Sequence, residues 1–124
     1  LHPMYRRQRQ MCIRDRAARV ALGCDEAVEK FNAEYEKRRE IMKKGLSDLP
    51  GIRVIEPEGA FYIFADVTGT GMTDREFADG ALEAGVQLIP ASLITGGEGF
   101  IRVSYATDEE SIHEGIRRLK SWLV

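Results

Sequence analysis

Apolar residues recur at helical spacing through the first half of the chain and predict one long helix from about Glu26 to Asp48. Asp25 is placed to cap its start, and Pro50-Gly51 ends it because proline cannot continue the helical hydrogen bonds. At 1.5 Å per residue this helix would be about 34 Å long, which is more than a small domain requires. We therefore expect it to brace two domains. Its apolar stripe consists of Val28, Phe31, Tyr35, Met42, Leu46 and Leu49.

Four runs with strand character follow the long helix. Ile52–Ile55 and Val86–Pro90 predict short strands. Ala60–Val67 is apolar on both faces and rich in aromatic residues, which is typical of a covered central strand. Gly99–Tyr105 predicts a buried strand, and its alternation places Ile101, Val103 and Tyr105 on one face and Phe100, Arg102 and Ser104 on the other.

Two capping boxes predict the remaining helices. Thr73 with Glu76 begins a helix that Gly85 ends, and Thr107 with Glu110 begins the last helix. The resulting order of elements predicts an α+β domain with a small, mainly antiparallel sheet covered by helices on one side. The inward-facing residues are predicted to be Phe77, Ala81 and Leu82 in the first of these helices, and Ile112, Ile116, Leu119 and Leu123 in the second.

The composition limits the classes of protein to which the chain can belong. Its 124 residues form one domain at most, and a hydrophobic fraction of 44% is ordinary for a globular protein. It contains no apolar run long enough to span a membrane and no signal-peptide pattern, so we expect no membrane partner and a cytoplasmic location. Cys12 and Cys24 predict neither a disulfide framework nor a metal site.

The net charge of −2 is divided unevenly along the chain. Residues 1–19 contain six arginines and one aspartate, a net charge of +5, which leaves −7 for the rest. One interpretation is a basic arm that binds nucleic acid, although no recognition motif accompanies it. The other is that residues 1–16 are non-native or disordered. We expect residues 17–24 to be the remnant of an upstream helix that Gly23 ends.

Arg102 is a full charge in the middle of a strand predicted to be buried. Its guanidinium must either reach water along its aliphatic stem or meet an anion through a planar pair of hydrogen bonds. A strand arginine that extends to water is the commoner case.

Two motifs favour the anion. The run Pro57–Tyr62 and the run Gly97–Ala106 together resemble the C-terminal region of the pyridoxal-phosphate aminotransferases of fold type I, the aspartate aminotransferase group. The resemblance implies that residues 25–124 are the C-terminal small domain of such an enzyme, in which the long interdomain helix precedes the sheet. It also implies that the whole enzyme transfers an amino group between an amino acid and a 2-oxo acid as a homodimer, without nucleic acid.

The resemblance also assigns substrate-binding residues. Arg102 would bind the α-carboxylate, while Gly59 and Ala60 would approach the substrate and Phe61 would supply an apolar wall. We interpret Tyr62 as a core residue. Arg38-Arg39 matches an arginine-rich stretch of the family's long helix, and we interpret it as a solvated helix face.

The cofactor-binding groups are not recognisable in this sequence. An aminotransferase holds pyridoxal phosphate through a lysine Schiff base, but the five lysines all lie on polar faces of predicted helices. We therefore predict no catalytic residue here, a cofactor bound by the missing domain, and no activity of this chain alone. Asp66 is interpreted as the cap of a turn, and His2 and His113 receive no role.

One loop departs from the family's pattern, because Pro90–Thr95 lacks two glycines that the family has there. This change affects the loop expected to close over the substrate. Two other functions stay open at this point: a free-standing α+β module that binds amino acids through Arg102, and a nucleic-acid-binding domain with a basic arm.

Overall fold

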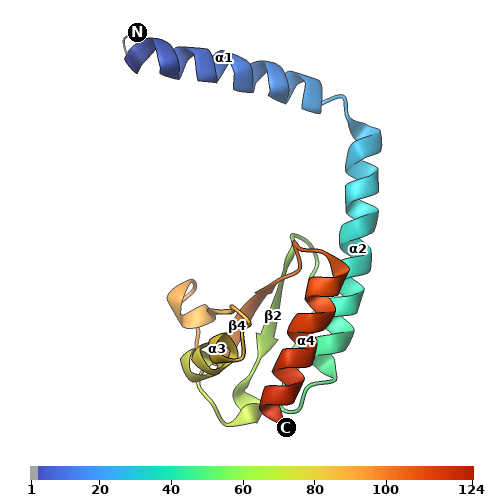
Figure 1. Ribbon diagram of the computed structural model, residues 1–124, viewed down its shortest axis with the longest axis vertical. Helices are drawn as coiled ribbons and strands as arrows, with labels where there is room; N and C mark the ends of the chain where they lie inside the picture. The colour runs from blue at the N-terminus through green and yellow to red at the C-terminus, as the bar shows by residue number, and fades with distance from the viewer. Residues whose placement is uncertain (1–2) are drawn as a thin grey trace. The chain divides into compact units, whose positions relative to one another are not determined.

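The computed structural model describes residues 3–124, with side chains from Met11 onward. The chain divides into two compact units, one that ends at Glu34 and one that runs from Tyr35 to Val124. Helix α1, Pro3–Ala21, belongs to the first unit, and helix α2, Asp25–Ser47, begins in the first unit and ends in the second (Figure 1).

The first unit is helical, and every described side chain from residue 11 to residue 33 is exposed. Helix α1 ends where predicted, and the amide of Gly23 donates to the carbonyl of Val20 in the turn that follows. Asp25 is the first residue of α2 rather than its cap, because the first helical amides donate to the carbonyl of Cys24. That residues 1–16 are non-native or disordered stays a prediction.

The second unit contains a four-stranded sheet in the order β1-β2-β4-β3, and all neighbouring strands are antiparallel. The central pair is β2, Tyr62–Asp66, and β4, Phe100–Ser104, which pair over five residues. The edges are two-residue strands, β1, Arg53–Val54, and β3, Ile89–Pro90. The α+β fold with a small antiparallel sheet is therefore confirmed.

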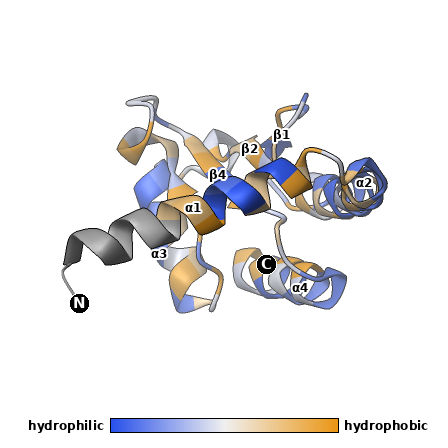
Figure 2. Cartoon of the chain, turned by 90° about the horizontal axis from the view of Figure 1, so that it is seen from above, coloured by the Kyte–Doolittle hydropathy of each residue, from blue (hydrophilic) through white to orange (hydrophobic). Residues whose placement is uncertain are grey.

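Three helices cover one face of the sheet. They are α2, α3 at Asp74–Glu83 and α4 at Glu109–Leu123, and α4 shows its hydrophilic colour on the side away from the strands (Figure 2). The core is continuous across the two layers, and the strands alternate between this core and the opposite face. The residues that build it include Leu46, Ile63, Ala65, Phe77, Ile101, Val103, Ile112 and Leu119.

The face of the sheet opposite the core is only half-buried, which corrects the prediction that β2 is covered on both sides. Tyr62, Phe64 and Asp66 alternate with the buried Ile63 and Ala65 and retain partial exposure. Aromatic residues on both faces suggested two covered faces, but within the second unit only one face has helices against it. We call the other face the outer face.

Helix α3 starts as the sequence predicts, but one of its inward positions and the cap of α4 differ. The Thr73–Glu76 capping box is present, with the Glu76 amide donating to the Thr73 hydroxyl at 3.2 Å. Leu82 is 59% exposed, and Ala78 is buried in its place. Asp108, not Thr107, caps α4 by accepting from the Ser111 amide at 2.8 Å, because a carboxylate one residue later caps equally well.

Short 3₁₀ turns, at Thr68–Thr70 and Ala91–Leu93, complete the second unit. No helix of the described chain is long and apolar enough to cross a membrane.

The closeness of α3 to α4 predicts the effect of a single methyl group. A Cβ at Gly80 would lie 2.2 Å from the rigid indole of Trp122, whereas a Cβ at Gly115 would meet nothing within 4 Å. We expect Gly80→Ala to lower the free energy of unfolding by about 1–2 kcal/mol through overpacking. The control Gly115→Ala should raise it by about 0.5–1 kcal/mol through helix propensity. Urea unfolding measures both, and equal stabilisation by the two changes would contradict the packing described here.

Candidate functional site

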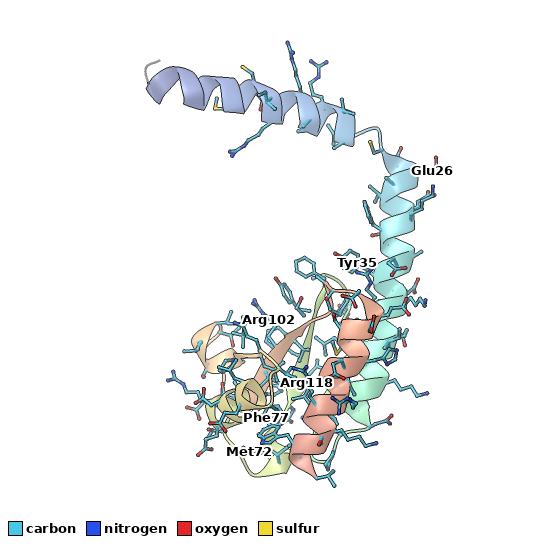
Figure 3. The ribbon with its side chains drawn as sticks, viewed as in Figure 1. Glu26, Tyr35, Met72, Phe77, Arg102 and Arg118 are labelled. Carbon is cyan, nitrogen blue, oxygen red and sulfur yellow. The ribbon has the colours of Figure 1, made fainter. Side chains whose placement is uncertain are left out.

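Arg102 lies on the outer face at the centre of the sheet (Figure 3). Its neighbour on β2 is Phe64, and its neighbour on β3 is Ile89. The next position beyond Phe64 is Ile55, whose amide donates to the Phe64 carbonyl at 2.9 Å. Arg102 is therefore the single charge in a row of apolar residues across the sheet.

The guanidinium of Arg102 has an aromatic neighbour but no carboxylate. Its central carbon lies 4.3 Å from the centre of the Tyr62 ring, which is a favourable cation–π distance. Within the described chain the Arg102 side chain makes no ion pair or hydrogen bond, whereas the Arg53 side chain pairs with Asp66 at 2.8 Å. The Arg102 guanidinium is thus half-buried and oriented, and its N–H donors are free to bind an anion.

Tyr62 is not the core residue that the sequence suggested. It is half-buried on the outer face beneath Arg102, because β2 alternates and Ile63 takes the core position. The aromatic pattern gave no sign of this role. The antiparallel register, in which Tyr62 lies opposite Ser104 and therefore diagonal to Arg102, would have been needed to find it.

Gly59, Ala60 and Phe61 lie directly before Tyr62, the first residue of β2. Phe61 is 41% exposed, and its ring centre lies 4.3 Å from that of Tyr62. Gly59 has open space where a side chain would be. Phe61, Tyr62 and Arg102 therefore form a continuous surface of ring, ring and guanidinium.

Sequence reasoning missed two tyrosines behind this surface. The Tyr105 hydroxyl donates to the Ala60 carbonyl at 2.6 Å, and Ala60 has a positive φ of 60°. The Tyr35 ring lies 6.3 Å from both Phe61 and Tyr105. The available signal was a phenol at a predicted core position, since a buried hydroxyl requires a partner.

Asp66 caps a turn, as predicted. Its Oδ1 accepts from the Thr68 hydroxyl at 2.6 Å and from the Thr68 amide at 3.0 Å, while Arg53 pairs with Oδ2. These hydrogen bonds, those from Thr68 above all, lower the pKa of Asp66 to about 2 from its ordinary value of 3.8. Asp66 is thus a structural carboxylate.

The loop that departs from the family's pattern is anchored from below by α3. Asp74 is 3% exposed and accepts from the Ser92 amide at 2.9 Å. The residues after Pro90 form the turn Ala91–Leu93, which ends with the Ile94 amide donating to the Ala91 carbonyl. The loop therefore forms a 3₁₀ turn at the positions where the family's pattern has two glycines.

Arg38 and Arg39 are half-buried, which corrects their interpretation as a solvated face. Arg39 interacts with Glu36 and Glu40, and Arg38 lies 5.7 Å from the Tyr35 ring. Arginine commonly buries its aliphatic stem while its charged head stays at the surface, which is consistent with this half-burial.

Comparison with known proteins supports the resemblance that the motifs suggested. The family model described as "Aminotransferase class I and II" matches residues 7–119. The chain belongs to this aminotransferase family.

The similar proteins are much longer than this chain. An aspartate aminotransferase of Pyrococcus horikoshii is 44% identical over 99 residues, covering 78% of this chain and 25% of that protein. Aromatic-amino-acid aminotransferase 2 of Thermococcus litoralis is 39% identical over 100 residues, covering 79% and 25%. The chain thus spans about a quarter of the length of the curated relatives it matches.

Solved structures agree with this assignment. The crystal structure of an aromatic aminotransferase from Pyrococcus horikoshii OT3 has a TM-score of 0.72 at 38% identity, covering 77% of this chain and 26% of that one. An aspartate aminotransferase from Thermus thermophilus with maleate has a TM-score of 0.72 at 31% identity, covering 78% and 25%.

The family implies pyridoxal phosphate, but the lysines of this aminotransferase chain do not fit its Schiff base. All five lie on α2 or α4, the helices that cover the core face rather than the outer face. Lys43 pairs with Glu56 at 2.7 Å, and this hydrogen bond raises the pKa of Lys43, whereas a Schiff-base lysine requires a lowered one. The described residues also contain no cluster of three or more potential metal ligands.

The Asp66 turn predicts how stability depends on pH. Because the pKa of Asp66 is lowered on folding, its contribution of about 2 kcal/mol is complete above the unfolded pKa and is lost as pH falls towards 2. We expect Asp66→Asn to flatten the fall in unfolding free energy between about pH 5 and about pH 2. Thr68→Val should flatten it more than Arg53→Gln, since Thr68 is the larger cause. Parallel curves for all four proteins in acid denaturation would contradict this account.

Proposed function

We propose that this chain supplies the substrate-carboxylate site of a pyridoxal-phosphate-dependent aminotransferase, with Arg102 as the residue that binds the α-carboxylate. The full-length enzyme transfers an amino group between an amino acid and a 2-oxo acid. One observation supports this most strongly: Arg102 is half-buried in an apolar row, oriented by Tyr62, and makes no ion pair within the described chain.

The chemistry of the guanidinium suits a carboxylate. Its N–H groups form a rigid planar fork that meets both carboxylate oxygens at once, which a lysine cannot do. The Tyr62 ring contacts the guanidinium through a cation–π interaction, which leaves all the N–H donors of Arg102 available for a carboxylate. Apolar neighbours such as Phe64 and Ile89 exclude water from one side, and a charge-assisted hydrogen bond is stronger where water is excluded.

Phe61 extends the site beyond the carboxylate. Its exposed ring adjoins Tyr62, so a substrate bound to Arg102 would place its side chain near this apolar wall. Gly59, with open space at its Cα, lets a ligand approach the backbone. Arg102 would therefore bind the α-carboxylate that all amino acids share, and Phe61 would contact the side chain that differs between them.

The cofactor and the assembly belong to the rest of the enzyme. Pyridoxal phosphate, when bound, supplies the electron sink for the amino-group transfer. We place its lysine and phosphate donors outside this chain, because the lysines of α2 and α4 do not fit that role. A homodimer in the cytoplasm is the assembly and location we propose.

The substitution Arg102→Lys tests the carboxylate site in the full-length enzyme. The charge is kept but the fork is lost, which should cost about 1.5–3 kcal/mol. We expect kcat/KM to fall roughly tenfold to a hundredfold or slightly more, equally for an acidic and an apolar amino acid. The matched control is Arg53→Lys, which makes the same change on the same face of the sheet at an arginine already paired with Asp66.

Stability separates the functional role from a structural one. Arg102→Lys should leave the thermal midpoint almost unchanged, because the guanidinium packs against nothing in the core. A midpoint lowered by many degrees with a nearly normal kcat/KM would make Arg102 a structural strand charge and overturn the proposal.

Borohydride trapping tests where the cofactor binds. We expect the 124-residue chain, mixed with pyridoxal phosphate and reduced, to show no stoichiometric labelling of a single lysine. In the full-length enzyme, mass spectrometry should find the labelled lysine outside this sequence. Stoichiometric labelling of one lysine of α2 or α4 would refute the assignment of the cofactor site to the rest of the enzyme.

A further inference from the structure

Tyr105 lies just after β4 and is 1% exposed, yet it contacts the backbone of a segment far back in the sequence. Its hydroxyl donates to the Ala60 carbonyl at 2.6 Å, and its amide donates to the Phe61 carbonyl at 3.1 Å. Burial raises the pKa of Tyr105, so the phenol stays a neutral donor. One residue thereby fixes two successive carbonyls of the segment Gly59–Phe61.

The segment has a backbone conformation that must be held in place. Ala60 is the one non-glycine residue with a positive φ among those that the structure describes. A left-handed conformation brings the Cβ of an L-residue close to its carbonyl oxygen, and such residues persist only where their surroundings fix them. The Tyr105 hydroxyl supplies that constraint at the carbonyl of Ala60 itself.

The conformation of Ala60 decides where the next side chain goes. Phe61 directs its ring between Tyr35 and Tyr62, with ring centres 6.3 Å and 4.3 Å away. Tyr62 in turn lies under the Arg102 guanidinium. The separation between the Phe61 ring and Arg102 therefore depends on how the Gly59–Phe61 segment is held.

We propose that Tyr105 is a positioning residue for substrate specificity, whose hydroxyl holds the Gly59–Phe61 segment so that Phe61 stands at a fixed distance from Arg102. This inference rests on the proposed function. Tyr105 itself does not touch the substrate, since it is buried in the core beside Tyr35.

The first measurement needs no enzymatic activity. In the 124-residue chain, we expect Tyr105→Phe to lower the backbone amide order parameters of Gly59, Ala60 and Phe61 from about 0.85 towards about 0.6. The matched control is Tyr35→Phe. Tyr35 is the neighbouring ring, and its hydroxyl makes no hydrogen bond within the described chain. In Tyr35→Phe the order parameters of Gly59, Ala60 and Phe61 should therefore stay at their original values.

The second measurement is substrate discrimination by the full-length enzyme. Loss of one hydrogen bond should change the ratio of kcat/KM for an apolar amino acid to that for an acidic one by about threefold to tenfold. The apolar substrate should lose more, because it depends on the Phe61 wall. Tyr35→Phe should keep the ratio, and Arg102→Lys should lower both values together.

The outcomes distinguish this inference from the proposed function. Unchanged order parameters in Tyr105→Phe would overturn it, and so would lowered order parameters with an unchanged substrate ratio. If Arg102→Lys has no effect on kcat/KM while Tyr105→Phe still loosens the segment and shifts the ratio, the carboxylate assignment fails and the positioning role of Tyr105 stands.

Discussion

Successive residues of a β-strand point to opposite faces, and in β4 this constraint fixes both the core and the site. Ile101 and Val103 pack between the sheet and its helices, where they face Ala65 and Ile63 of β2. Arg102, between them, can only point away from the core. A slip of one residue would bury the guanidinium and expose both apolar side chains, so the packing of the core determines the direction of the arginine.

The surroundings of Arg102 on the outer face suit the anion site that we propose. Arg102 has apolar neighbours along its row and an aromatic ring beneath it, and one carboxylate of that face, Asp66, is already bound by Arg53 and Thr68. The guanidinium keeps contact with water in the free chain, which makes its charge tolerable without a partner. In the proposed site, the guanidinium would exchange water for a carboxylate of matched geometry without first breaking an ion pair.

The sequence predicted the elements of this domain well, because local signals decided them. The capping box at Thr73, the breaker at Pro50-Gly51 and the alternation around Arg102 all depend on residues close in the chain. The sequence predicted Leu82 to face inward and Thr107 to cap α4, and both predictions were wrong. In each case another residue close in the chain takes the role, because neighbouring residues compete for it. The family, too, was identified from two short motifs.

What the sequence did not predict depends on register and on contacts between distant segments. Tyr62 lies beneath Arg102 only because β2 and β4 pair as they do. The hydrogen bond from the Tyr105 hydroxyl to the Ala60 carbonyl joins residues 45 positions apart, and no local sequence pattern predicts it. Arg38 is half-buried beside the aromatic ring of Tyr35, a neighbour that the charge pattern did not indicate.

Arg102 and Tyr105 are three residues apart on one continuous piece of chain, and this has a consequence for movement. Any rigid-body displacement of β4 carries the guanidinium and, through the phenol, the Gly59–Phe61 segment with it. In the enzyme that we propose, a rigid-body shift of this unit would therefore leave the distance between Arg102 and the Gly59–Phe61 segment unchanged. In the site that we propose, every amino acid would meet the same distance between the Arg102 guanidinium and the Phe61 ring before and after such a shift.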